Sequence, residues 1–206
     1  MHLSSVPAPF GIGTMGQCAR KFIDFLKNAG QRYWQILPVG QTSYGDSPYQ
    51  SFSSFAGNPY FIDLDLLKED NLITQEEIDS LFFGENPSQV DYGALYQNRF
   101  ELLKTATLRG YGRDAQAVAQ FAKENAHWLE DYTLFMALKR HFDMRSWLDW
   151  PNKQVRLRDP RALAHYREEL KEDIRLFTYI QYLFFTQWKS LRDYAHRKGI
   201  GIIGDI

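Results

Sequence analysis

Apolar positions at helical spacing, followed by a short apolar run, predict a helix and then a strand near the N-terminus. Residues 14–17 (Thr-Met-Gly-Gln) fit a helix capping box, and Gly30 supplies a stop signal. The apolar residues at helical spacing between them are Cys18, Phe22, Phe25, Leu26 and Ala29. Residues 33–37 are apolar and aromatic and end at Pro38, which is typical of a buried parallel strand. This order predicts half of a β/α repeat.

Downstream, the pattern changes from short elements to long helices. Residues 60–64 predict another short extended segment, and residues 74–77 (Thr-Gln-Glu-Glu) begin a second helix with its own capping box. From residue 91 to about residue 198 the apolar spacing is almost entirely helical, and Asp159 with Pro160 predicts the start of a later helix. We expect two or three of these helices to form an inserted subdomain.

The last helical stripe leads directly into a second strand pattern. This stripe consists of Ile180, Phe184, Gln187, Trp188, Leu191 and Ala195. Gly199 ends the helix, and residues 200–206 form a buried-strand pattern with Asp205 near its carboxyl end. Residues 2–7 resemble the tail of a strand that runs into a loop. Because both ends of the sequence fall within predicted core elements, we expect the chain to be a fragment of a larger α/β protein.

Composition narrows the class of protein. The 206 residues are 44% hydrophobic and carry a net charge of −1, as in ordinary folded proteins, and this balance argues against nucleic acid as the main partner. No apolar run approaches the roughly 20 residues of a membrane-spanning helix, and we expect a cytoplasmic protein with no membrane partner. The single cysteine, Cys18, excludes an internal disulfide. We expect no metal site, because the histidines lack ligand spacing: His127, His141, His165 and His196.

Residues 11–16 match the pattern G-x-G-x-x-G at the start of a predicted helix. Two prolines, Pro7 and Pro9, leave no complete strand before the motif, and residues 38–41 (Pro-Val-Gly-Gln) stand where a ribose-binding acid would follow the next strand. We therefore interpret these glycines as a flexible lead into the helix and do not predict nucleotide binding.

The loop of residues 40–60 carries the candidate binding chemistry. Its aromatic residues are Tyr44, Tyr49, Phe52, Phe55 and Tyr60, and its short polar residues are Asp46, Ser47, Gln50 and Ser51. Sugars offer apolar faces that stack on aromatic rings and hydroxyl groups that need polar partners. This combination, at the carboxyl end of a predicted strand, indicates a polyhydroxylated ligand. In the alternative interpretation, the aromatic residues fill a local core beneath an ordinary loop.

The longest recognisable motif is residues 45–60 (GDSPYQSFSSFAGNPY), which closely resembles the amylomaltase family of 4-α-glucanotransferases, glycoside hydrolase family 77. Residues 34–38 and residues 6–13 resemble family segments as well. So do residues 146–151 (SWLDWP) and residues 199–206 (GIGIIGDI), so that the resemblance runs the length of the chain.

This resemblance implies a (β/α)8 TIM barrel, of which the chain is an incomplete N-terminal part with a largely helical inserted subdomain. Residues 1–66 would hold the first barrel elements and the glucan-binding loop, and residues 67–178 the inserted subdomain. Residues 179–206 would hold a barrel helix and the start of the third barrel strand. The implied reaction transfers α-1,4-glucan segments between maltooligosaccharides by a retaining double displacement. It needs no cofactor.

The resemblance also implies which residues bind sugar. The three catalytic carboxylates of the family match no residue of this chain, so we assign no catalytic residue and expect the isolated chain to be inactive. Ser47 and Tyr49 match residues that line the glucan cleft. Tyr44 and Tyr92 match aromatic residues of a second glucan site in some members, and we add Asp46 as a polar partner.

Two other functions remain open. The chain could be a stand-alone glucan-binding protein, or a helical interaction module without sugar affinity. For Asp205 we expect a structural role in orienting a strand end or a neighbouring loop. We expect Trp147 and Trp150 to pack between helices. An open set of two or three strands leaves unpaired edges and apolar faces, so we expect the chain to self-associate or to be partly disordered.

Overall fold

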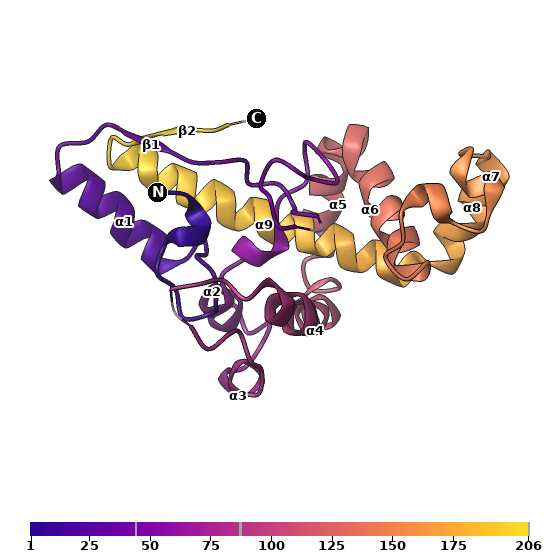
Figure 1. Cartoon of the computed structure of the whole chain (residues 1–206), viewed down its shortest axis with the longest axis horizontal. Helices are drawn as coiled ribbons and strands as arrows, with labels where there is room; N and C mark the ends of the chain where they lie inside the picture. Colours follow the sequence, from indigo (N-terminus) through magenta and orange to yellow (C-terminus); the bar gives the residue numbers. More distant parts are fainter. Residues whose placement is uncertain (44, 87, 206) are drawn as a thin grey trace.

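One long helix, α9 (Lys171–Arg197), runs through the middle of the molecule, and the other elements are arranged around it (Figure 1). The computed structural model describes residues 1–43, 45–86 and 88–205. Helix α9 has 27 residues, about 40 Å at 1.5 Å per residue, and contacts elements from both halves of the chain. Its stripe of apolar residues is largely buried, as its spacing predicts, from Ile180 and Phe184 to Leu191 and Ala195.

Two short strands form a parallel pair at one end of α9. Strand β1 (Tyr33–Gln35) pairs with β2 (Gly201–Ile203), with Trp34 opposite Ile202, which confirms the predicted parallel strands. Helix α1 (Gln17–Asn28) and helix α9 contact the pair. The buried-strand patterns hold for Trp34, which is 2% exposed, whereas Tyr33 is 64% exposed and Ile203 46% exposed, as expected for an open set of strands with an exposed apolar face.

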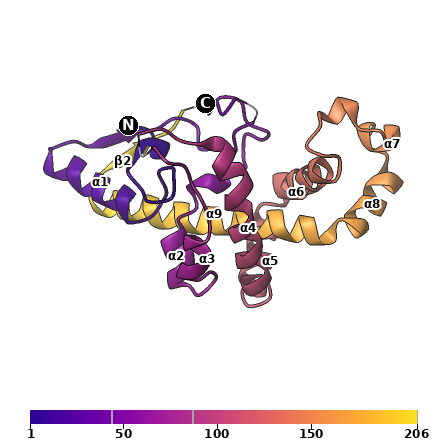
Figure 2. The same ribbon diagram turned by 60° about the horizontal axis from the view of Figure 1, so that its bottom comes forward.

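The remaining helices lie around α9, and those from α4 onward confirm the predicted helical region between residues 91 and 198. They are α2 (Leu64–Glu69), α3 (Gln75–Asp79), α4 (Tyr92–Gly110), α5 (Ala115–Glu124), α6 (Ala126–His141), α7 (Lys153–Arg156) and α8 (Pro160–Glu169). Short 3-10 helices lie at η1 (Leu3–Ser5), η2 (Pro59–Phe61) and η3 (Trp147–Asp149). In both views, α7 and α8 lie at the end of α9 far from α1 (Figure 2).

Two apolar clusters hold these elements together. The main cluster joins residues of the N-terminal segment, such as Leu3 and Trp34, to residues of α4, α5, α6 and α9. The smaller cluster packs α6 against α7 and α8 around Trp150, which is 4% exposed, as predicted for a helix-packing residue. Trp147 differs, because 48% of it is exposed. The division into three parts at residues 66 and 178 stays a prediction.

One local prediction near the N-terminus is wrong, and a second holds only in part. The Thr14 hydroxyl does not cap α1, where Gly16 is the N-cap, but donates a hydrogen bond of 2.6 Å to buried Asp63. The predicted extended segment of residues 60–64 is reduced to Ile62 and Asp63, because Asn58 caps η2 before them and Asp63 accepts a hydrogen bond from Leu66 N–H at the start of α2. Buried carboxylates require donors, and this need takes precedence over the local capping pattern.

The other predicted helix signals are confirmed. The box of Thr74 and Glu77 at the start of α3 is reciprocal, and Asp159 accepts from the first N–H groups of α8. The stop signals Gly30 and Gly199 have positive φ angles of 69° and 79°. No helix within the described ranges combines the length and apolar character needed to cross a bilayer.

The glycines of residues 11–16 serve close packing, so their interpretation as a flexible lead into the helix is wrong. A Cβ on Gly13 would lie 1.9 Å from the carbonyl oxygen of Leu3, and one on Gly16 would lie 2.0 Å from Asp63 Oδ2. The glycines are therefore explained by the close approach of backbone and a buried carboxylate.

Candidate functional site

The loop of residues 40–57, called the aromatic loop from here on, follows β1 and folds back on itself. Its neck closes through an antiparallel bridge between Gly40 and Gly57, and a second bridge joins Thr42 to Ser51. Just past the neck, Asn58 N–H donates to the carbonyl oxygen of Val39 at 2.9 Å. The loop is thus a formed element rather than a linker.

The tip of the aromatic loop reaches the carboxyl end of β2. Tyr49, which is 57% exposed, donates a hydrogen bond of 2.7 Å from its hydroxyl to Asp205 Oδ2. The Ser47 hydroxyl is half-buried and accepts a hydrogen bond of 3.3 Å from Tyr49 N–H. The structure therefore brings Ser47, Tyr49 and Asp205 together, and the contact of Asp205 with the loop agrees with its expected structural role. The predicted residue Tyr44 lies outside the described residues.

A second group of predicted residues lines a cavity of about 620 Å³. Asp46 and Tyr92 face this space, called the Asp46–Tyr92 pocket, together with residues of the segment before α4. These are Phe82, Glu85, Asn86, Gln89, Val90 and Asp91. Burial raises the pKa of the Asp46 carboxyl, and burial followed by the charge of Asp46 raises the pKa of the Tyr92 phenol. The pocket therefore combines an aromatic wall with three carboxyl groups.

The segment of residues 82–91 was missed as part of a site. Its loop-type composition, with Gly84 at a positive φ of 111°, indicates a turn rather than a helix. Nothing in that composition reveals that it faces Asp46, because the two segments are about 40 residues apart in sequence and meet only through tertiary folding.

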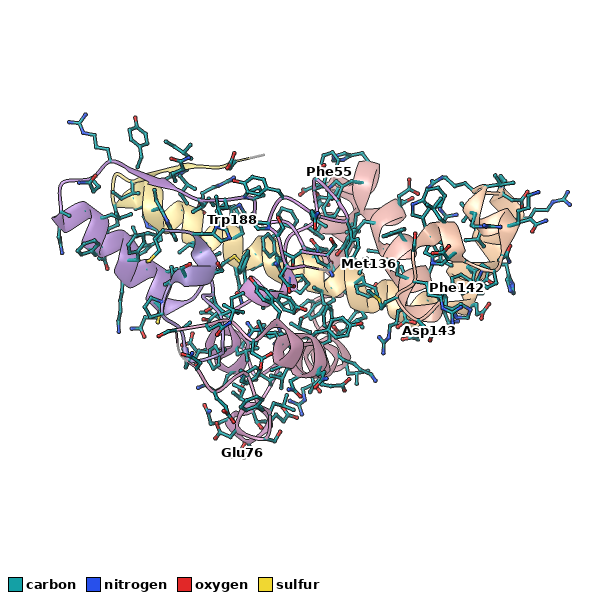
Figure 3. All side chains as sticks on the ribbon, viewed as in Figure 1. Phe55, Glu76, Met136, Phe142, Asp143 and Trp188 are labelled. Atoms are coloured by element: carbon teal, nitrogen blue, oxygen red, sulfur yellow. The ribbon has the colours of Figure 1, made fainter. Side chains whose placement is uncertain are left out.

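Not all aromatic residues of the predicted loop of residues 40–60 are available to a ligand. Tyr60 is 7% exposed, and Phe52 packs against Phe135 with ring centroids 6.2 Å apart. Phe55 stacks on Trp128 of α6 with centroids 6.1 Å apart, yet 57% of it is exposed (Figure 3). The interpretation as a local core thus holds for Phe52 and Tyr60, whereas Tyr49 and Phe55 offer accessible rings.

A smaller cavity of about 220 Å³ lies between α9 and the carboxyl ends of the strands. Its lining includes Leu37 and Pro38 after β1, Trp188 of α9 and Asp205 after β2. Among the residues that the structure describes, no group of three or more His, Cys, Asp or Glu side chains is placed to hold a metal ion.

A parallel strand pair backed by helices, with an aromatic loop at its carboxyl ends and a pocket of carboxyl and tyrosine side chains, defines an α/β protein with a candidate binding site built from loops. The glycoside hydrolase 77 family model, described as 4-alpha-glucanotransferase, matches residues 1–206. The chain therefore belongs to this family.

The similar proteins agree with this assignment. The chain is 51% identical over its whole length to a 4-alpha-glucanotransferase of Clostridium butyricum and 46% identical to one of Thermus thermophilus. It covers 42% and 41% of these two relatives. Among solved structures, it is similar to the amylomaltase from Streptococcus agalactiae in complex with acarbose, with 42% identity and a TM-score of 0.97. It covers 42% of that chain, so the 206 residues span less than half the length of these proteins.

Proposed function

We propose that the chain forms the glucan-binding and scaffold part of a 4-α-glucanotransferase. Such an enzyme transfers α-1,4-glucan segments to the 4-hydroxyl of an acceptor sugar by a retaining double displacement. The observation that carries this proposal is the exposed Tyr49, held at the carboxyl ends of both strands by Asp205, in a chain that belongs to the family. No cofactor is part of the proposed reaction.

We propose further that β1, α9 and β2 are units of a (β/α)8 barrel. Their support is the parallel register of the strands and the position of α9 immediately before β2. In this arrangement, residues 1–66 and 179–206 hold barrel elements and residues 67–178 form the inserted subdomain.

We assign substrate binding to Ser47, Tyr49, Tyr44, Tyr92 and Asp46. The supporting geometry places Ser47 and Tyr49 beside Asp205, and Asp46 and Tyr92 in a separate pocket. Tyrosine rings can stack on the apolar face of a sugar, while Asp46 and Ser47 can hydrogen-bond its hydroxyl groups. The two groups would thus contact different stretches of one glucan, or two glucans. The ligands are α-1,4-glucans and maltooligosaccharides.

Calorimetric titration of the purified chain with maltoheptaose tests this assignment. We expect measurable affinity that falls in Tyr49→Ala and in Tyr92→Ala. Tyr33→Ala is the matched control, because Tyr33 is a tyrosine with 64% exposure on the strand pair, outside both groups. Equal loss in all three variants, or no affinity of the wild-type chain, would contradict the proposal and favour the helical interaction module.

Turnover is tested separately by incubating the chain with maltotriose and measuring glucose release, with the Streptococcus agalactiae amylomaltase as the positive control. We expect no glucose from the 206 residues alone, because none of their carboxylates is assigned a catalytic role. Affinity without turnover would also suit a stand-alone glucan-binding protein, which the two bridges that close the loop allow. Glucose release would show that carboxylates of this chain carry the chemistry.

A further inference from the structure

A side-chain amide from α9 forms two hydrogen bonds with the neck of the aromatic loop. Gly57 N–H donates to Gln181 Oε1 at 2.8 Å, and Gln181 Nε2 donates to the carbonyl oxygen of Gly57 at 3.0 Å. Gln181 is fully buried, with 0% exposure. One amide thus satisfies both backbone groups of a single loop residue, as a neighbouring strand would do.

The same amide belongs to a buried chain of hydrogen bonds that reaches the other side of the neck. The Tyr132 hydroxyl of α6 donates to the Gln41 side chain, and the side chains of Tyr132 and Gln181 are also hydrogen-bonded. Because the single Tyr132 hydrogen goes to Gln41, its oxygen must accept from Gln181. Tyr132 is 5% exposed and Gln41 7% exposed. These hydrogen bonds therefore link Gln41, near the start of the aromatic loop, to Gly57 at its end, through side chains of α6 and α9.

We propose that Gln181, acting through Tyr132 and Gln41, is a positioning residue that sets the geometry of the aromatic loop. The neck residues Gly40 and Gly57 have no side chains of their own to pack, so backbone pairing and this chain of hydrogen bonds fix how the loop leaves the helices. The effect on sugar affinity rests on the proposed function, whereas the effect on loop geometry does not.

The molecule contains a matched control six residues further along α9. The Gln187 side chain binds the backbone of Asp63 in the same way. Asp63 N–H donates to Gln187 Oε1 at 2.7 Å, and Gln187 Nε2 donates to the Asp63 carbonyl oxygen at 3.2 Å. Gln187 is 7% exposed. It therefore offers the same chemistry and similar burial at a site outside the loop neck.

The experiment compares Gln181→Met with Gln187→Met in the full 206-residue chain. Both variants remove one buried amide and leave two backbone groups without it, so we expect both to lose stability. The N–H groups of Ser43 and Gln50 donate hydrogen bonds to carbonyl oxygens within the loop. Only Gln181→Met should accelerate amide hydrogen exchange at these two residues. Only this variant should also weaken maltoheptaose binding, by about tenfold. Gln187→Met should change neither the exchange rates at Ser43 and Gln50 nor the maltoheptaose affinity by more than about twofold.

Equal effects of the two variants on loop exchange, or no effect of Gln181→Met, would overturn the positioning role. Absence of maltoheptaose binding by the wild-type chain would instead overturn the proposed function, while loop exchange would still decide the positioning role. If Gln181→Met does not fold, Tyr132→Phe removes one oxygen from the same chain. It should then show the same selective acceleration at Ser43 and Gln50, and exchange at wild-type rates would overturn the proposal.

Discussion

Tyr49 and Asp205 lie 156 residues apart in sequence and share a hydrogen bond of 2.7 Å from the tyrosine hydroxyl to the carboxylate. Tyr49 lies on the aromatic loop, and Asp205 follows β2 at the carboxyl end of the strand pair. This bond fixes the tip of the loop, while Gln181 holds its neck. The candidate sugar-binding surface is therefore attached at both ends to elements that meet only in the folded chain.

Replacing Asp205 by Asn should lower the pKa of Tyr49. The hydrogen bond to the Asp205 carboxylate, followed by burial and the carboxylate charge, raises the Tyr49 pKa above its usual value of about 10. A raised pKa means that the bond stabilises the fold fully below that value and is lost as pH rises through the higher folded pKa. Ultraviolet difference titration of each protein against its own Tyr49→Phe form isolates this phenol. Identical midpoints with and without Asp205 would contradict the contact.

Replacing Gly57 by Ala should destabilise the fold by about 1–3 kcal/mol, because a Cβ there would lie 2.1 Å from the Phe184 ring on α9. Gly112→Ala is the control, since a Cβ on Gly112 meets nothing within 4 Å, and its effect should stay within about 0.5 kcal/mol. Urea unfolding of both variants measures the difference. Equal urea midpoints for Gly57→Ala and Gly112→Ala would show that Phe184 does not pack closely against residue 57.

The free energy of unfolding should fall between pH 6.5 and pH 4 because of His2. Burial, and then the positive N-terminal amine, lower the His2 pKa to about 4 from 6.5. Since the unfolded chain binds the proton first, the His2 contribution to stability is fully present above pH 6.5 and is lost as pH falls through the folded pKa. The neutral ring accepts a hydrogen bond of 3.1 Å from Leu37 N–H through Nδ1.

Urea unfolding of the wild-type chain and of His2→Asn at several pH values tests this expectation. Asn can still accept a hydrogen bond but does not titrate, so the variant should lose less stability over the same interval. Parallel curves for the two proteins would assign the acid sensitivity to other groups.

The helical part of the fold was predictable because its signals are local. Apolar spacing, the Thr74 capping box, Asp159 before Pro160 and the glycine stops each act within a few residues. The Thr14 box failed because its hydroxyl has a better partner in Asp63, 49 residues away. A local pattern cannot show that a buried carboxylate will need that donor.

The candidate site was predictable only in part, for a similar reason. The composition of the aromatic loop indicates a sugar, and the match of Tyr92 comes from the family resemblance. Tertiary contacts bring residues 82–91 to the Asp46–Tyr92 pocket, and they also bring the Gln181 amide to the backbone of Gly57. Gln181 illustrates the limit, because a single glutamine within an apolar helical stripe has no sequence signature that distinguishes a backbone clamp from an ordinary polar residue.

The purified chain should self-associate through its strand pair. Tyr33 and Ile203 expose 64% and 46% of their surfaces, and a cavity of about 220 Å³ lies beside the strand ends. Open strand edges and apolar faces favour association with a second copy. Light scattering after size exclusion should detect dimers or larger species, and Ile203→Lys with Tyr33→Lys should reduce them. Leu108→Lys, which changes a residue with 78% exposure on α4, should not. A monodisperse monomer that melts cooperatively would contradict this prediction and would mean that a two-stranded sheet of this kind is stable with one face exposed.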